Sequence, residues 1–169
     1  GSFFDGSRVQ VVNYAIGGRS SKTFVQEGRL DEVKKNLQKG DIMMVQFGHN
    51  DRYFGSKARE VPFDSLGYWL QQYADVAKGA GVTLVYVTPM NMNMGANGRN
   101  IFTEYNVVGK MEELAKKNGA VYVNLNAKSY NAYSKSWDPA YVSRYQFKMF
   151  LKGEYPNYPD GVTNDGTTH

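Results

Sequence analysis

Four short runs of apolar residues recur along the chain, at residues 9–14, 42–47, 82–87 and 120–125. Each run is rich in Val, Ile, Leu, Met or aromatic residues and ends at a glycine, a proline or a polar turn signal, which is typical of a β-strand. Strands that are apolar at nearly every position favour a parallel sheet with both faces covered. The runs therefore predict four buried strands in one such sheet.

The stretches between these runs carry the three- and four-residue apolar spacing of amphipathic helices. The longest is residues 63–80, where Gly79 and Gly81 bracket the end. We expect further helices over residues 30–37 and 102–118, a loop over 91–100, and an irregular remainder from Asn126 with some helix around 139–151. The alternation predicts a single α/β domain over residues 1–169, with three α/β/α layers around a central parallel sheet.

Polar sequence follows the predicted strands, and ligands of open parallel sheets bind outside the carboxyl ends of the strands. The candidate loops are therefore residues 13–21, 48–51 and 89–100, and residues 164–169 form a further polar cluster. Residues 48–51, Gly-His-Asn-Asp, place an amide side chain where it can donate to an oxyanion. The same four residues are equally typical of a plain strand-ending turn.

The loop over residues 13–21 has two adjacent glycines, Gly17 and Gly18, whose backbone N–H groups can bind an anion at the start of a helix. Glycines required only for a positive φ explain the pattern as well. In the tail, Asp165 and His169 lie four residues apart, and a histidine oriented by a carboxylate is the general base of serine-type hydrolysis. A solvated tail is the alternative.

Composition narrows the possible chemistry. The chain has no cysteine, which excludes disulfides, thiolate metal sites and a thiol nucleophile. Its two histidines, His49 and His169, argue against a histidine-rich metal site. The net charge of +4 favours a polyanionic partner, but the basic residues are scattered and form no run of the nucleic-acid-binding type. No apolar stretch reaches the roughly 18 residues of a membrane span. We expect neither nucleic acid nor membrane as a partner.

Taken in order along the chain, the motifs resemble one family. They are Asn-x-Ala-x-Gly-Gly-Arg-Ser-Ser at 13–21, Glu-Gly-Arg at 27–29, Gly-Asp at 40–41, Gln-Phe-Gly-His-Asn-Asp at 46–51, Thr-Pro at 88–89 and the Asp/His tail. This order resembles the SGNH hydrolases, and within them the rhamnogalacturonan acetylesterases, over nearly the whole chain. The resemblance implies an SGNH (flavodoxin-like) fold and removal of acetyl groups from pectic polysaccharide, without a metal or organic cofactor.

The resemblance also implies roles for individual residues. The oxyanion would bind to the backbone N–H of Gly18 and the side-chain amide of Asn50. His169 would be the base and Asp165 its orienting carboxylate, although the family usually places the aspartate three residues before the histidine; Asp160 is a weaker substitute. His49 is expected to be structural.

The nucleophile is the main departure from the family. Its serine belongs to a Gly-Asp-Ser motif on a first strand, and that motif does not occur in these 169 residues. We expect that strand and a closing C-terminal helix to lie outside the chain, so that the chain alone is inactive. A missing N-terminal segment or a neighbouring chain is then expected to complete the sheet.

The implied partner is an acetylated acidic polysaccharide, and a secreted enzyme is expected. Two alternatives remain open. One is an SGNH esterase or lipase for another acyl ester, with the Met-rich residues 90–94 lining an acyl pocket. The other is a catalytically inactive carbohydrate-binding relative that keeps the fold.

Overall fold

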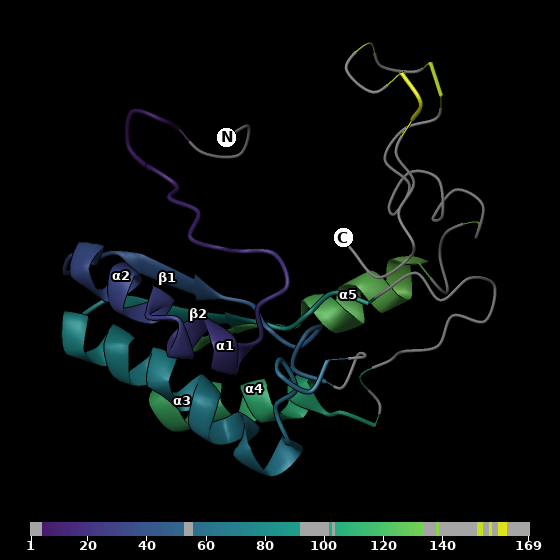
Figure 1. Cartoon of the computed structure of the whole chain (residues 1–169). Coiled ribbons are helices and arrows are strands. Elements are labelled where there is room, and N and C mark those ends of the chain that lie inside the picture. The colour runs from purple at the N-terminus through teal and green to yellow at the C-terminus, as the bar shows by residue number, and fades with distance from the viewer. Residues whose placement is uncertain are drawn as a thin grey trace.

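A parallel sheet forms the centre of the structure (Figure 1). This computed structural model describes residues 5–52, 56–91, 102, 104–133, 138, 152–153, 156 and 159–161. Within them, β1 (Ile42–Val45), β2 (Thr83–Val87) and β3 (Val121–Val123) pair in the order β1-β2-β3, with Ile42 opposite Thr83 and Val85 opposite Val121. The predicted α/β class with a central parallel sheet is confirmed, and three of the four predicted strands are found.

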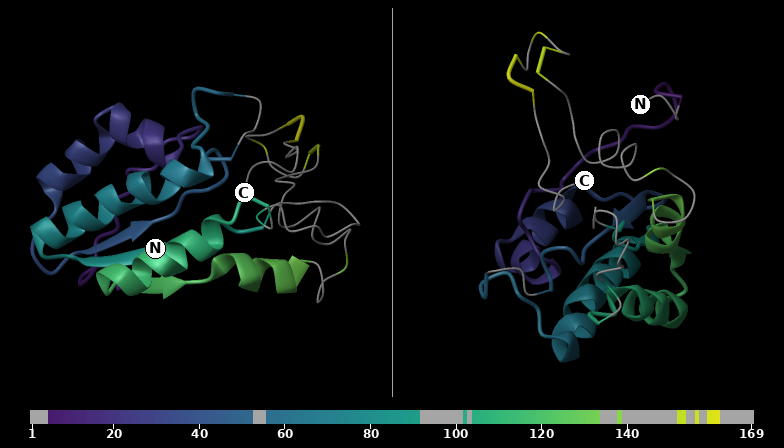
Figure 2. Two further views of the ribbon diagram at one scale, coloured as in Figure 1. Left: turned by 90° about the horizontal axis from the view of Figure 1, so that it is seen from below. Right: turned by 90° about the vertical axis from the view of Figure 1, so that its right-hand side faces the viewer.

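The helices are α1 (Ser21–Gln26), α2 (Arg29–Asn36), α3 (Phe63–Ala80), α4 (Val107–Asn118) and α5 (Leu125–Asn131). Helix α3 has the predicted bounds and ends at Gly81, whose φ of 68° is a left-handed C-cap that glycine adopts without strain. Helices α1, α3 and α4 lie on the same side of the sheet (Figures 1 and 2). Helix α5 continues the chain beyond the end of β3.

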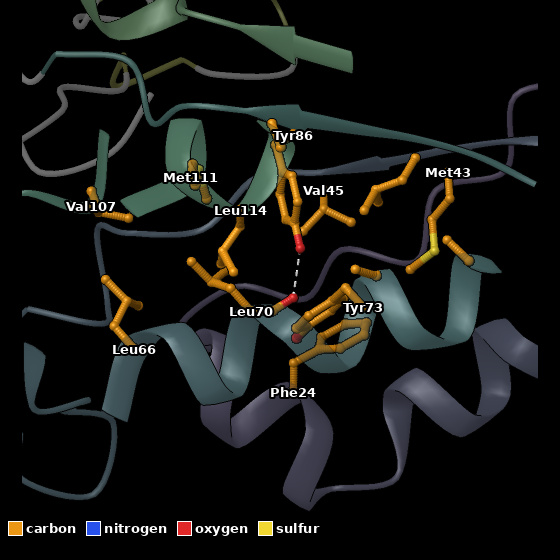
Figure 3. Packing of buried hydrophobic residues seen from close by; sticks show 14 of the residues in the cluster. Phe24, Met43, Val45, Leu66, Leu70, Tyr73, Tyr86, Val107, Met111 and Leu114 are labelled. Atoms are coloured by element: carbon orange, nitrogen blue, oxygen red, sulfur yellow. Dashed lines mark hydrogen bonds between the residues drawn. The ribbon is translucent and has the colours of Figure 1, made fainter. Parts of the chain in front are cut away.

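The core lies between that side of the sheet and the helices (Figure 3). Alternate residues of the strands point into it, among them Met43, Val45 and Tyr86, where they meet the apolar stripes of α3 and α4. The Tyr86 hydroxyl donates a hydrogen bond of 2.7 Å to the Leu70 carbonyl, which satisfies the one polar group of this buried ring. The core therefore fixes α3 against the middle strand.

The opposite face of the sheet is exposed at its β1 edge and at the start of β3. Ile42, Met44 and Val121 are 66%, 68% and 49% exposed. β1 has β2 as its one strand neighbour among the described residues, so its other edge has unpaired backbone groups.

The strand predicted over residues 9–14 is wrong for this structure. The segment has no strand partner among the described residues, and Val9, Val11 and Val12 are 47%, 67% and 58% exposed. A β-branched run forms a strand only beside another strand, because its propensity reflects packing and pairing and not the isolated backbone. The residue pattern of 9–14 is typical of a strand, but no strand lies beside this segment among the described residues.

Several helix boundaries also differ from the prediction. The helix predicted over residues 30–37 is found as α2, and a short helix that was not predicted, α1, precedes it across Gly28, whose φ is 73°. Helix α4 begins at Val107 and not at 102, since the Asn106 side chain accepts a hydrogen bond from the Gly109 N–H as its N-cap. Asn124 caps α5 in the same way, in a region predicted to be irregular. The helix expected around 139–151 lies outside the described residues.

Candidate active site

Asp51 joins two of the loops that the sequence singled out. Its buried carboxylate accepts hydrogen bonds from the Ser21 N–H at 3.0 Å, from the Ser21 hydroxyl, and from the Gly48 N–H at 3.0 Å. Ser21 begins α1 directly after the glycine loop, whereas Gly48 lies three residues beyond β1. One side chain therefore fixes the glycine loop against the carboxyl end of β1.

Two opposing effects act on the Asp51 carboxyl. Burial raises its pKa, and the hydrogen bonds from Ser21 and Gly48 oppose that rise without cancelling it. The neighbouring Tyr73 hydroxyl donates a hydrogen bond of 2.9 Å to the Ser21 carbonyl. Burial, and then the nearby Asp51, raises the pKa of Tyr73, so this phenol stays protonated as a donor.

Gly18 presents a backbone donor at the end of the glycine loop. Its φ of 77° is in the left-handed region, which favours glycine. Arg19 holds the preceding turn, with its Nη1 donating to the Gly17 carbonyl at 3.0 Å and its Nε to Glu27 at 3.0 Å. The Gly18 N–H donates to none of the described residues. The loop therefore has an N–H group without a partner among the described residues, and the oxyanion role of Gly18 stays a prediction.

Asn50 presents the second donor. Its Nδ2 donates to the Arg19 carbonyl at 3.2 Å, and its Oδ1 accepts from Arg59 Nη1 at 3.0 Å. The second Nδ2 hydrogen has no acceptor among the described residues. Arg59 Nη1 also lies 3.7 Å from the point that a Cβ on Gly18 would occupy. Gly18 and Asn50, predicted from different loops, are thus brought together at one guanidinium.

The turn that carries Asn50 depends on close packing at Gly48. Gly48 has a φ of 135°, and a Cβ there would lie 2.7 Å from Pro89 Cγ and 3.1 Å from Val107 Cγ1. His49, next in the chain, has its Nε2 2.9 Å from the Met90 carbonyl and its ring edge-on to Phe102. These contacts agree with the structural role expected for His49.

The two serines beside Gly18 are not available to attack a substrate. Ser20 and Ser21 are both fully buried. Ser20 is the N-cap of α1, with its hydroxyl accepting from the Thr23 N–H, and the Ser21 hydroxyl donates to Asp51. Both serines therefore stabilise the start of α1 directly after the glycine loop.

Asp165 and His169 lie outside the described residues, so their predicted roles stay predictions. Sequence reasoning missed Asp51 and Arg59. Asp51 is adjacent to Asn50 in the motif, which was a usable signal, but its hydrogen bonds from Ser21 cross 30 positions of sequence. Arg59 follows Asn50 by nine positions in a loop, and nothing in the pattern marked it.

Among the described residues, no three His, Cys, Asp or Glu side chains come together in a group able to hold a metal ion. None of the described helices is both long enough and apolar enough to cross a bilayer. The Gly18 N–H and the Asn50 amide are placed to donate hydrogen bonds to an anion.

Comparison with known protein families identifies the family of this chain. The family model for GDSL-like lipase/acylhydrolase matches residues 3–169. The chain belongs to this family. The match covers both donor loops and the tail with Asp165 and His169, so the resemblance inferred from the motifs is confirmed at the level of the family.

The chain is similar to proteins named as rhamnogalacturonan acetylesterases. It is 35% identical to rhamnogalacturonan acetylesterase RhgT of Bacillus subtilis, over 93% of this chain and 66% of that protein. It is 31% identical to a rhamnogalacturonan acetylesterase of Emericella nidulans, over 73% of this chain and 58% of that protein. The chain thus spans no more than about two thirds of either relative. The chain also superposes on the crystal structure of YxiM from Bacillus subtilis, with a TM-score of 0.68 and 22% identity. The superposition covers 78% of this chain and 37% of YxiM, and it shows a shared fold.

Proposed function

We propose that the protein is a serine-type esterase that removes acetyl groups from an acidic pectic polysaccharide of the rhamnogalacturonan type. The observation that carries the proposal is a pair of available donors near the carboxyl end of β1, the Gly18 N–H and the second Nδ2 hydrogen of Asn50. Two such donors are what a tetrahedral oxyanion requires. The names of the relatives support acetyl esters of rhamnogalacturonan as the substrate, and the net charge of +4 suits a polyanion.

The proposed reaction has two steps. A serine oxygen attacks the acetyl carbonyl carbon while His169, oriented by Asp165, takes the serine proton. The oxyanion accepts hydrogen bonds from Gly18 and Asn50, and the sugar oxygen leaves with the proton held by His169. Water then attacks the acetyl-enzyme in the same way, which releases acetate and restores the serine.

The nucleophile in this proposal is a serine other than Ser20 and Ser21, because both are buried and already hydrogen bonded. A serine-directed fluorophosphonate probe tests this directly. The intact mass of the full-length protein should rise by the mass of one adduct. Peptide mapping should place the label on neither Ser20 nor Ser21. A label on Ser20 or Ser21 would overturn the assignment.

The substrate is tested by acetate release from a panel of esters. We expect release from acetylated rhamnogalacturonan to exceed release from acetylated xylan, and p-nitrophenyl acetate to be a better substrate than esters with longer acyl chains. A preference for long acyl chains would instead favour a lipase. Sugar binding without any turnover, unchanged in His169→Ala, would favour an inactive carbohydrate-binding relative. Because pectin is an extracellular polymer, we further propose that the enzyme is secreted.

A further inference from the structure

We propose that Arg59 is a positioning residue that sets the orientation of the Asn50 amide in the oxyanion site. The inference rests on the proposed function, since it assigns Arg59 a part in the same site. Its starting point is the 3.0 Å hydrogen bond from Arg59 Nη1 to Asn50 Oδ1. Neither the motif nor the fold points to this residue, which lies in the loop before α3.

The donor chemistry of arginine determines the orientation of the amide. A guanidinium has N–H donors and no acceptor, so the group of Asn50 that faces Arg59 must be the carbonyl oxygen. The opposite group, Nδ2, is thereby directed to the Arg19 carbonyl at 3.2 Å, beside Gly18. One Nδ2 hydrogen is used there, and the other remains for the oxyanion. Without Arg59, Asn50 can rotate and present its oxygen, which repels an oxyanion.

Arg59 is itself held in place by backbone contacts. Its N–H donates to the Ser56 carbonyl at 3.3 Å, and the Val61 N–H donates to the Asp51 carbonyl at 2.8 Å. Lys22 Nζ, from α1, donates to the Glu60 carbonyl at 2.5 Å. The loop that carries Arg59 is therefore joined to both elements that carry the two oxyanion donors.

Arg59 forms no ion pair with a carboxylate in the part of the chain that the structure describes. Its charge is consequently not neutralised by a neighbouring acid. Nη1 lies 3.7 Å from the Cβ position of Gly18, so the positive charge is close to where the oxyanion would form. A charge-assisted hydrogen bond also makes the Nδ2 hydrogens of Asn50 better donors.

A double-mutant cycle that measures acetyl-ester hydrolysis by the full-length protein tests the proposal. Arg59→Met should lower kcat by about 10- to 100-fold with little change in KM, because the substrate still binds while the amide is misoriented. Arg59→Lys, which keeps a donor and the charge, should recover part of the loss. In an Asn50→Ala background, Arg59→Met should have no further effect. Arg8→Met, at an exposed arginine, is the matched control.

Two results of the cycle would overturn the proposal. One is a loss from Arg59→Met that is as large in the Asn50→Ala background as in the wild type. The other is a rise in KM for the pectic substrate alone, with p-nitrophenyl acetate unaffected, which would show that Arg59 binds a substrate carboxylate.

A second readout does not depend on turnover. The Asn50 side-chain amide of the wild type should give two well-separated proton resonances in a ¹⁵N–¹H NMR spectrum, with slow hydrogen exchange. In Arg59→Met these should move toward the values of a free amide. An unchanged Asn50 amide in Arg59→Met would overturn the proposal. Absence of all esterase activity in the wild type would instead contradict the proposed function and leave the NMR result to decide on Arg59.

Discussion

Asp51 and Arg59 show how single residues determine the site that the motif only marks. The motif identifies Gly18 and Asn50, but the distance between their loops depends on the Asp51 carboxylate, which accepts from both Ser21 and Gly48. The direction of the Asn50 amide depends on Arg59. The Asp51–Ser21 and Arg59–Asn50 contacts join residues that no local pattern relates, which is why sequence reasoning pointed to Gly18 and Asn50 and not to the groups that hold them.

The buried Asp51 predicts a pH dependence of stability. The folded-state pKa of Asp51 is raised above the unfolded value of about 3.8, so the folded state holds the proton more tightly. The contribution of Asp51 to the free energy of unfolding therefore falls as the pH rises from about 3.8 through the folded-state pKa. The unfolding free energy of wild type minus that of Asp51→Asn should therefore be largest at low pH and decrease toward neutrality. Urea titrations across this range measure it. A difference that grows with pH would mean that the donors from Ser21 and Gly48 outweigh burial.

At the scale of elements, each of the two donor loops depends on a glycine. Gly18 has a positive φ, whereas Gly48 has both a positive φ and no room for a side chain beside Pro89 and Val107. The turn after β1 is thus packed directly on Pro89, which follows β2, and on Val107, the first residue of α4. Its geometry depends on the core beneath it as well as on its own sequence.

This packing predicts opposite outcomes for two glycine substitutions. Gly48→Ala should destabilise the protein by about 1–3 kcal/mol, because its Cβ would meet Pro89 Cγ at 2.7 Å. Gly79→Ala is the control: Gly79 is within α3, has nothing within 4 Å of its Cβ position, and should gain about 0.5–1 kcal/mol. Thermal unfolding of both variants measures the effects. Equal stability of the two would contradict the packing described at Gly48.

The elements also show what local pattern can predict. Helix α3 was predicted because its apolar spacing agrees with its burial, and the three paired strands because each is an apolar run between turn signals, although Ile42, Met44 and Val121 in these strands are exposed. Residues 9–14 have an equally good strand pattern and no strand partner among the described residues, so pairing overrode propensity. Helix α5 was missed because its sequence, Leu-Asn-Ala-Lys-Ser-Tyr-Asn, carries almost no apolar stripe, and capping by Asn124 defines its start.

On the scale of the whole molecule, the sheet has one edge that is neither paired nor covered among the described residues. Ile42 and Met44 of β1 and the segment with Val9, Val11 and Val12 are exposed together with that edge. Exposed apolar surface and unpaired strand groups favour association with another strand. We propose that a further segment or a neighbouring chain completes the sheet beside β1.

This surface predicts self-association of a protein that consists of the 169 residues alone. Its apparent mass in light scattering should increase with concentration, and Met44→Lys should reduce the increase because it places a charge on the exposed face. Lys78→Met, on the solvent side of α3, is a comparison that should not reduce it. A strictly monomeric species across the concentration series would contradict the proposal.

The measurement that tests the central claim most directly is the kinetic comparison, in the full-length protein, of Asn50→Ala with wild type on p-nitrophenyl acetate. Asn36→Ala, at the exposed end of α2, is the control and should behave as wild type. If Gly18 and Asn50 form the oxyanion site, Asn50→Ala should lower kcat by about 10²–10³-fold with a nearly unchanged KM and melting temperature. A kcat equal to that of wild type would show that Asn50 does not stabilise the oxyanion, and the site described here would be wrong.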